Sequence, residues 1–190
     1  MPRDGGPARL RLRQAALELY EQNGFDQVTT AEIAARAGVT ERTFYRHFPD
    51  KREVLFDGER TLREALVAAV AEAPEALAPL PTLLMAFRAV APALVANRPV
   101  SEPLRRVIAA TPALRERAQA KSAALTEALA DALRGRGVSP AEASLAAHIG
   151  MGVFSHVSAV WFQNPERDPD EILGEAFAEL QALTTPLAQP

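Results

Sequence analysis

The chain has 190 residues, of which 48% are hydrophobic and only 6% aromatic, and its net charge is −3. It contains no cysteine, which excludes disulfides, thiolate nucleophiles and zinc sites built on cysteine. The length allows one sizeable domain, or a small domain of about 50 residues attached to a larger one. Abundant Ala and Leu favour helices packed on helices over a β-sandwich.

The sequence indicates neither a membrane span nor a secretory signal. No window approaches the ~20 consecutive apolar residues that a spanning helix needs, since even GMGVFSHVSAVWF contains polar side chains. The opening MPRDGGPARLRLRQ lacks the apolar segment of a signal peptide. We therefore expect a cytoplasmic protein with no membrane partner. Residues 1–52 carry a net positive charge and the remainder a net negative one, which fits a basic head on an acidic body.

Helical periodicity begins near the N-terminus. Apolar residues recur at helical spacing in ARLRLRQAALELYEQNG, and Gly24 provides a stop, which predicts a helix over residues 8–23. Thr29 followed by Glu32 is a capping-box pattern. It opens a short second helix, TAEIAARA, which Gly38 ends.

A third short helix and a long fourth helix follow. Thr40 is in position to cap ERTFYRHF, which must end near Phe48 because Pro49 disfavours helical geometry in the residue before it. Asp50 is then placed to cap a long helix that begins KREVLFDGER and ends near Pro74.

Proline residues separate the later helical segments. They precede TLLMAFRAVAPALVAN and LRRVIAA, and Pro112 precedes a long alanine-rich run. Ser139 followed by Pro140 is a helix-start signature that leads into AEASLAAHIGMGVFSHVSAVWFQN. These segments predict further helices of an α-helical body.

A last helix is expected from Asp168 or Asp170 to about Thr184. In total the pattern predicts about nine helices and no strand, because no segment alternates with period two. The predicted fold is all-α: a three-helix head, residues 1–52, joined by a long helix to a helical body, residues 53–190.

The second and third helices have the spacing of a helix-turn-helix, because a turn containing glycine separates them. The second helix of this motif enters the major groove of DNA, and its N-terminal side chains reach base edges. Arg42 and Thr43 are therefore expected to face bases, since Arg pairs with guanine and Thr suits several base edges. The side chains expected to contact phosphate, which fixes register without reading sequence, are Thr29, Thr30, Thr40, Tyr45, His47 and Lys51.

Structural roles compete with DNA contact for several residues. Phe44 and Phe48 are expected in the core, because a three-helix head needs large apolar side chains. The ring of Tyr45 can pack while its hydroxyl reaches phosphate. Taken alone, His47 suits a solvated surface position. A solvated helix face and DNA-backbone contact explain three early arginines equally well: Arg9, Arg11 and Arg13.

The stretch GFDQVTTAEIAARAGVTERTFYRHFPDKREVL, with AALELY before it, resembles the DNA-binding signature of the TetR (tetracycline repressor) family of bacterial transcriptional regulators. The resemblance covers residues 8–56 and joins the capping Thr, the IA..AGV turn, the FY.HF cluster and the following Lys. It implies a transcriptional repressor that binds double-stranded DNA and is released by a small molecule. Glu41, at the front of the recognition helix, would prefer a cytosine amino group or no base.

Dimerisation is expected in the last two long helices. Two heads usually dock about 34–36 Å apart on a pseudo-palindromic operator, so a homodimer must form through the body. Gly150 and Gly152 each cost up to ~1 kcal/mol inside a helix, which a close approach to a partner, an internal packing contact or a kink would explain. The family resemblance implies that aromatic and apolar residues of the same two helices complete the interface with the partner. The expected interface residues are Gly150, Gly152, Trp161, Phe162, Leu173, Phe177 and Leu180.

The helices over residues 52–134 are expected to surround a pocket for a small-molecule effector, as the family resemblance implies. LRRVIAATPALRERAQAKSAALTEALADAL resembles the C-terminal domain of a TetR subgroup that binds acyl-CoA-like ligands. This likeness implies a long apolar pocket with basic residues near its mouth, although plain core packing explains the apolar residues too. The candidate lining residues are Met85, Phe87, Leu94, Leu104, Arg105, Ile108, Leu125, His148 and Met151.

Two other classes of protein compete with a ligand-responsive repressor. An enzyme is not expected, because the chain has no Cys nucleophile, Gly-rich phosphate loop followed by Lys, His-Glu-x-x-His or G-x-S-x-G elbow. No catalytic residue, cofactor or metal site is therefore assigned. The second class is a DNA-binding adaptor whose helical body binds a protein partner in place of a small molecule. A cavity of several hundred Å³ would count against an adaptor.

Overall fold

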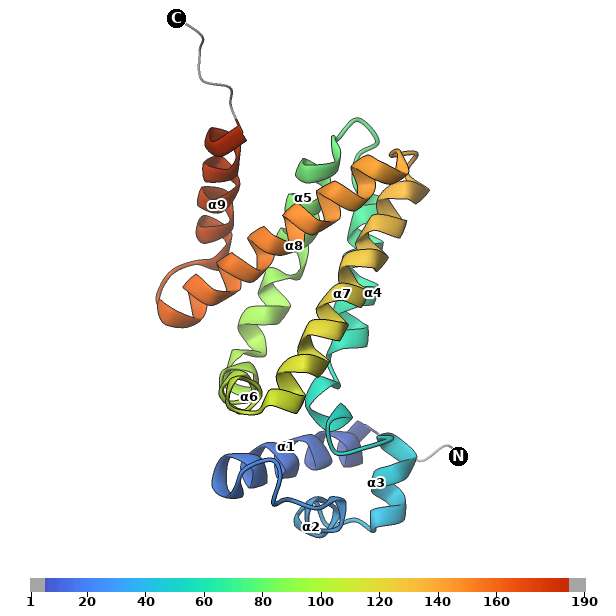
Figure 1. Cartoon of the computed structure of the whole chain (residues 1–190), viewed down its shortest axis with the longest axis vertical. Helices are drawn as coiled ribbons and strands as arrows, with labels where there is room; N and C mark the ends of the chain where they lie inside the picture. The colour runs from blue at the N-terminus through green and yellow to red at the C-terminus, as the bar shows by residue number, and fades with distance from the viewer. Residues whose placement is uncertain (1–5, 185–190) are drawn as a thin grey trace, which may run out of the picture. The chain divides into compact units, whose positions relative to one another are not determined.

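The computed structural model describes residues 6–184. Within them the chain forms nine α-helices and one 3-10 helix, η1, with no strand, which confirms the predicted all-α fold (Figure 1). The helices are α1 (Gly6–Asn23), α2 (Thr30–Arg36), α3 (Glu41–His47), η1 (Glu53–Phe56), α4 (Glu59–Glu72), α5 (Pro79–Ala96), α6 (Arg98–Ala110), α7 (Pro112–Gly135), α8 (Pro140–Gln163) and α9 (Pro169–Thr184).

The helices belong to two compact units. The first unit contains the chain up to Arg60 together with Asn97–Lys121, and the second unit contains Thr61–Ala96 together with the chain from Ser122 onward. Helix α6 and the first turns of α7 therefore belong to the same unit as α1, α2 and α3. The domain boundary expected after residue 52 lies just past the helix-turn-helix, whereas the first unit extends to Arg60 and also includes Asn97–Lys121.

The core of the first unit is built around aromatic side chains. Phe44 and Phe48 are 0% and 2% exposed, as expected from the sequence, and their ring centroids lie 5.8 Å apart. Tyr20 packs against Phe25 with 5.1 Å between ring centroids. Val107 of α6 and Leu114 of α7 belong to the same buried cluster. The short helices α2 and α3 thus share one core with α1 and with two segments far along the chain.

The core of the second unit lies between α4, α5, α8, α9 and the later turns of α7. Helices α5 and α8 approach closely at Gly150, where an added Cβ would lie 2.7 Å from Leu83 Cδ1. The internal packing contact considered for Gly150 is therefore present. Gly152 differs, because an added Cβ would meet nothing within 4 Å.

Helices α5 and α8 are long and apolar enough to cross a membrane by length and composition. Both also supply buried residues to the core of the second unit, including Phe87 and Met151. Core helices of globular proteins commonly share these properties, so the composition alone is weak evidence for a span.

The expected long fourth helix is interrupted. Asp50 Oδ1 accepts the backbone N–H groups of Arg52 and Glu53 at 2.7 and 3.1 Å, although the N-cap position of this segment is Arg52 and not Asp50. However, the segment is the single 3-10 turn η1, and the α-helical run begins again only at Glu59. Gly58, a poor helix former, precedes this restart, which explains the break.

Candidate nucleic-acid interface

Helix α2 begins with the predicted capping box. The Thr29 hydroxyl oxygen accepts the Glu32 N–H at 3.2 Å, and Glu32 Oε2 accepts the Thr29 N–H at 2.8 Å. The hydrogen bond from the Thr29 backbone, helped by a second from its hydroxyl, lowers the pKa of Glu32. Gly38 follows with φ +68°, a conformation that favours glycine, and so turns the chain toward α3.

Helix α3 is capped as the sequence predicts. The Thr40 hydroxyl oxygen accepts the Thr43 N–H at 3.2 Å, and the two Thr hydroxyl oxygens lie 3.0 Å apart. Phe48 has extended backbone geometry immediately before Pro49, which ends the helix at His47. These contacts confirm two short helices joined by a glycine-containing turn.

The starts of α2 and α3 are joined by side-chain hydrogen bonds. Thr30 Oγ1 donates to Glu41 Oε1 at 2.5 Å and lies 3.1 Å from the Tyr45 hydroxyl oxygen. Tyr45 is 54% exposed, and its ring meets the edge of Phe44 with 5.5 Å between centroids. The Tyr45 ring is therefore supported by the core, while its hydroxyl lies on the surface that α2 and α3 share.

The exposed face of α3 carries two guanidinium groups. Arg42 is exposed in the first turn, as expected for a residue that faces bases, and Thr43 beside it is half-buried. Arg46, one turn after Arg42, is also exposed. The sequence interpretation missed Arg46, although its spacing of four residues from Arg42 was the available signal. The face thus combines hydroxyl and guanidinium groups, which suits contact with nucleic acid.

Lys51 lies in a cage of backbone carbonyl groups. Its Nζ donates to the carbonyl oxygens of Phe25 and Val28, both at 2.9 Å, and to that of Asp26 at 3.4 Å. It also lies 4.4 Å from the centroid of the Phe25 ring. The three N–H donors of the ammonium group thus have acceptors within the protein. Lys51 therefore holds the loop between α1 and α2, a role that the sequence interpretation did not include.

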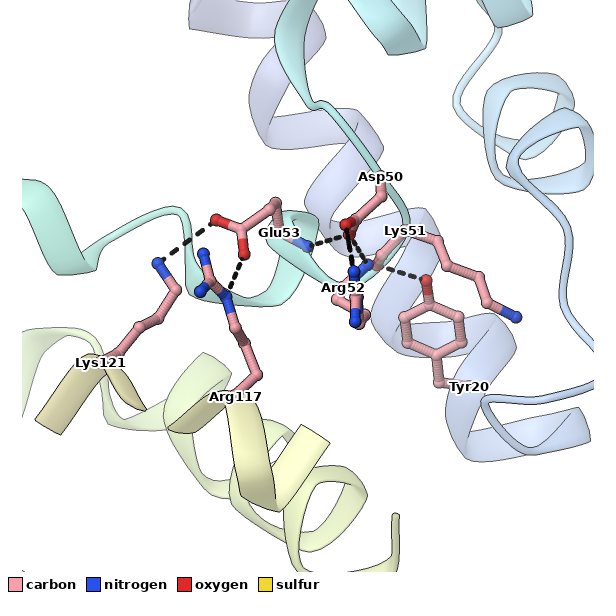
Figure 2. Close-up of polar contacts among 7 residues, drawn as sticks. All are labelled: Tyr20, Asp50, Lys51, Arg52, Glu53, Arg117 and Lys121. Atoms are coloured by element: carbon pink, nitrogen blue, oxygen red, sulfur yellow. Dashed lines mark hydrogen bonds and ion pairs between the residues drawn. The ribbon is translucent and has the colours of Figure 1, made fainter. Parts of the chain in front are cut away.

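Tyr20 ties the same segment to α1. Its hydroxyl donates to the Lys51 carbonyl oxygen at 2.7 Å (Figure 2). Burial, with a smaller contribution from the charge of Asp50, raises the pKa of Tyr20, so the hydroxyl remains a donor at neutral pH. Lys51 is therefore held at both ends. Its carbonyl oxygen accepts the hydrogen bond from Tyr20 of α1, and its ammonium group binds the loop between α1 and α2.

Glu53 connects η1 to the first turns of α7. Arg117 Nε donates to Glu53 Oε1 at 2.6 Å, and Lys121 Nζ lies 3.3 Å from Glu53 Oε2 (Figure 2). Lys121 Nζ also lies 2.6 Å from Glu59 Oε2. Burial would raise the pKa of Glu53, but the hydrogen bonds and charges of Arg117 and Lys121 outweigh it and lower the pKa. This cluster joins segments of the first unit that lie far apart in the sequence.

His47 is half-buried at the end of α3. Its Nε2 is buried without a hydrogen-bond partner. Burial lowers the pKa of His47, and the charges of Arg46 and Arg9 add to the effect against a small opposing contribution from Asp57. The imidazole is therefore neutral at pH 7 in the unbound protein, and its contact with phosphate stays a prediction.

The early arginines of α1 have structural partners. Arg9 forms an ion pair with Asp57, and its guanidinium carbon lies 4.8 Å from the centroid of the Phe48 ring. Arg11 Nε donates to the Ala37 carbonyl oxygen at 3.1 Å. Both side chains thus stabilise the head, an explanation beyond the two considered from the sequence.

The candidate ligand-pocket residues are divided between the two units. Leu104 and Ile108 of α6 pack against the apolar cluster of the first unit, and Arg105 on the same helix is exposed. The other candidates lie in the second unit. Leu104 and Ile108 therefore have a packing role in the same core as the DNA-binding helices.

In the second unit, Phe87 and Leu94 line a small apolar pocket together with Trp161 and Leu173. The space open to the centres of water molecules is about 30 Å³. The ring of Phe154 stacks on Phe87 with 4.8 Å between centroids and fills part of this region. Small-molecule sites commonly have volumes of about 300–1,000 Å³, so a ligand of that size would require this pocket to open.

The remaining pocket candidates have different surroundings. Leu125 and Met151 are buried in the core of the second unit, and Met85 is half-buried. His148 is exposed, and its Nδ1 lies 2.8 Å from the Ser144 carbonyl oxygen. The expected position of His148 on a pocket wall therefore does not match its location on the exposed face of α8.

The candidate dimer residues also separate into two groups. Trp161, Leu173 and Phe177 are 3–7% exposed and belong to the core of the second unit. Gly152 is exposed, and Phe162 and Leu180 are half-buried. The buried group packs inside the second unit, and only the second group has surface that a partner could contact.

We predict that Lys51→Met lowers the free energy of unfolding by about 2–4 kcal/mol, because three carbonyl groups lose a charged donor. Urea unfolding measures this change. Arg52→Met is the matched control, since Arg52 forms a surface pair with Asp50 at 2.9 Å, and it should cost less than about 1 kcal/mol. Equal losses in the two variants would contradict the structural role of Lys51.

The lowered pKa of Glu53 predicts a dependence of stability on pH. The folded-state pKa lies below the unfolded value of 4.5, so the stabilisation is fully present above pH 4.5 and is lost as pH falls through the folded-state pKa. Glu53→Gln should therefore flatten the decline of unfolding free energy in this acidic range. Urea unfolding at a series of pH values measures it, and parallel profiles for both proteins would show that Glu53 contributes nothing.

A family model described as "Bacterial regulatory proteins, tetR family" matches residues 12–57, which include α2, α3 and η1. The regulator TcmR of Streptomyces glaucescens is 39% identical over 82 residues, which make up 43% of this chain and 36% of TcmR. The nucleoid occlusion factor SlmA of Vibrio cholerae is 43% identical over 51 residues, 26% of each chain. The matches thus span about a third and about a quarter of these relatives.

A likeness to a solved structure extends over almost the whole chain. FadR of Thermus thermophilus, a TetR family transcriptional repressor solved in complex with lauroyl-CoA, is 27% identical with a TM-score of 0.58. The similarity covers 96% of this chain and 97% of FadR. Residues 12–57 therefore match the DNA-binding domain of the TetR family of bacterial regulatory proteins, and the likeness to a TetR family repressor extends over the rest of the chain.

Proposed function

We propose that this protein is a transcriptional regulator that binds double-stranded DNA and represses genes beside its operator. The observation that carries this proposal is the exposed face of α3, where Arg42, Tyr45 and Arg46 project from a helix whose Phe44 is fully buried. A rigid short helix with exposed guanidinium and hydroxyl groups fits the major groove.

The contacts divide into base readers and phosphate contacts. Arg42 and Thr43 read base edges, because they lie in the first turn of α3. Thr29, Thr30, Thr40, Tyr45 and His47 contact the DNA backbone. Lys51 acts indirectly in place of the phosphate contact expected from the sequence, since its ammonium group holds the loop that leads to Thr29.

A homodimer would place two such heads on a pseudo-palindromic operator. The exposed face of α8 supports this assembly, because Leu145, His148, Gly152 and His156 are exposed at helical spacing. The segment between Glu142 and Glu166 contains no Asp, Glu, Lys or Arg, and Leu145 is 63% exposed. An exposed helix face without charge is a typical protein–protein contact surface.

Similarity to FadR, solved with lauroyl-CoA, supports a small hydrophobic or acyl-type effector. Such an effector would release DNA only if it binds one arrangement of the protein more tightly than the other. The alternative is a DNA-binding adaptor whose body binds a protein. The pocket beside Phe87, at about 30 Å³, is too small for such an effector and fits this alternative. A wider, open hollow of about 550 Å³ beside Arg88, Val95 and Asp168 leaves space for a small molecule and fits the effector.

Selection of genomic fragments by the purified protein, followed by sequencing, should enrich a pseudo-palindrome. Arg42→Ala should then relax the preference at one base position per half-site, because it removes a base contact worth about 1–3 kcal/mol. Tyr45→Phe is the contrasting variant: it removes a phosphate contact and should weaken binding without changing which base is preferred at any position. Identical sequence profiles for the two variants would refute this division of roles.

Lauroyl-CoA provides a probe for the effector. If the body binds an acyl-type ligand, lauroyl-CoA should raise the melting temperature in a concentration-dependent manner and weaken binding to the enriched operator. Coenzyme A without the acyl chain is the matched control and should have little effect. DNA binding that lauroyl-CoA leaves unchanged, with no rise in melting temperature, would favour the adaptor.

A further inference from the structure

The hydrogen bonds among Thr30, Glu41 and Tyr45 have a fixed direction. A hydroxyl group has one hydrogen to donate, and an ionised carboxylate has none. Thr30 gives its hydrogen to Glu41 Oε1, so the contact of 3.1 Å between the two hydroxyl oxygens requires Tyr45 as the donor. In the unbound protein a chain of hydrogen bonds therefore runs from the Tyr45 hydroxyl through the Thr30 hydroxyl to the Glu41 carboxylate.

This hydrogen-bond chain occupies the two hydroxyl hydrogens, of Thr30 and Tyr45, that contact with phosphate requires. Phosphate oxygens only accept hydrogen bonds, so a Thr or Tyr hydroxyl must donate its hydrogen to contact the DNA backbone. Both hydrogens are already directed along the chain toward Glu41. A contact from Thr30 or Tyr45 to phosphate therefore requires Glu41 to release Thr30, or Tyr45 to turn away from it.

The position of the Glu41 carboxylate also opposes DNA binding directly. Glu41 is the first residue of α3 and is exposed, on the face that the proposed function directs at DNA. A carboxylate there meets the negative charge of the phosphates, and its partner within residues 6–184 is the neutral Thr30 hydroxyl. A donor on the DNA can replace Thr30 as its partner, and the major groove offers the amino groups of cytosine and adenine.

We propose that Glu41 is a specificity-determining residue that keeps the Thr30 and Tyr45 hydroxyls from phosphate until its carboxylate meets an amino group on a base. On DNA without that amino group in the correct place, Glu41 remains bonded to Thr30, and two backbone contacts are weakened. On the operator, the base takes over the carboxylate, and both hydroxyls turn to phosphate. This inference rests on the proposed DNA-binding function.

The test compares Glu41→Ala in two backgrounds, using a mixed-sequence duplex two helical turns long at several salt concentrations. In the otherwise wild-type protein, the substitution should raise the affinity about tenfold, because two hydroxyls are released. The dependence of affinity on salt should also become steeper by about one to two units. In a Thr30→Val/Tyr45→Phe background, the gain should be less than about threefold, because only the charge effect remains.

A second measurement tests discrimination with the operator enriched from genomic fragments. Glu41→Ala should reduce the ratio of operator affinity to mixed-duplex affinity by about tenfold or more. Glu41→Gln retains an acceptor for Thr30 but loses the charge, and it should give an intermediate ratio. Melting temperatures of all variants should remain near that of the wild-type protein, because Glu41 is exposed.

The outcomes separate the inference from the function on which it rests. Equal gains in the two backgrounds would show a charge effect alone and overturn the role of the hydroxyl chain. An unchanged affinity ratio would overturn the role in discrimination. A wild-type protein that binds no duplex even at low salt would overturn the proposed function itself.

Discussion

The ammonium group of Lys51, held by three carbonyl oxygens, is the interaction on which the DNA-facing surface depends. Helices α2 and α3 have seven residues each, and isolated helices shorter than about 12–15 residues are marginal in water. Their geometry must therefore come from tertiary contacts. Lys51 joins the end of the helix-turn-helix to the loop before it, and Tyr20 fixes Lys51 to α1. The start of α2 is thus positioned before DNA arrives.

The same unit extends beyond the helix-turn-helix. Val107 and Leu114 complete the core around Phe44, while Arg117 and Lys121 hold Glu53. Helix α6 and the first turns of α7 are therefore connected to the DNA-facing helices both by apolar packing and by charge.

Local patterns in the sequence predicted most of the fold and part of the candidate site. The capping box at Thr29, the N-cap at Thr40 and the stop at Gly38 act within a few residues, so their chemistry is visible in the sequence. The cage of Lys51 and the inward position of His47 depend on contacts between distant segments. No local pattern specifies such contacts, and both residues were therefore interpreted as surface groups.

The central claim is that the starts of α2 and α3 form a prearranged DNA-binding surface. The most direct test is a nuclear magnetic resonance titration of the full chain with a mixed-sequence duplex at low salt. The account predicts amide shifts concentrated at residues 29–30 and 40–46, with the loop at residues 25–28 unchanged. Binding that shifts other elements instead, such as α8 and α9, or no binding at low salt, would contradict it.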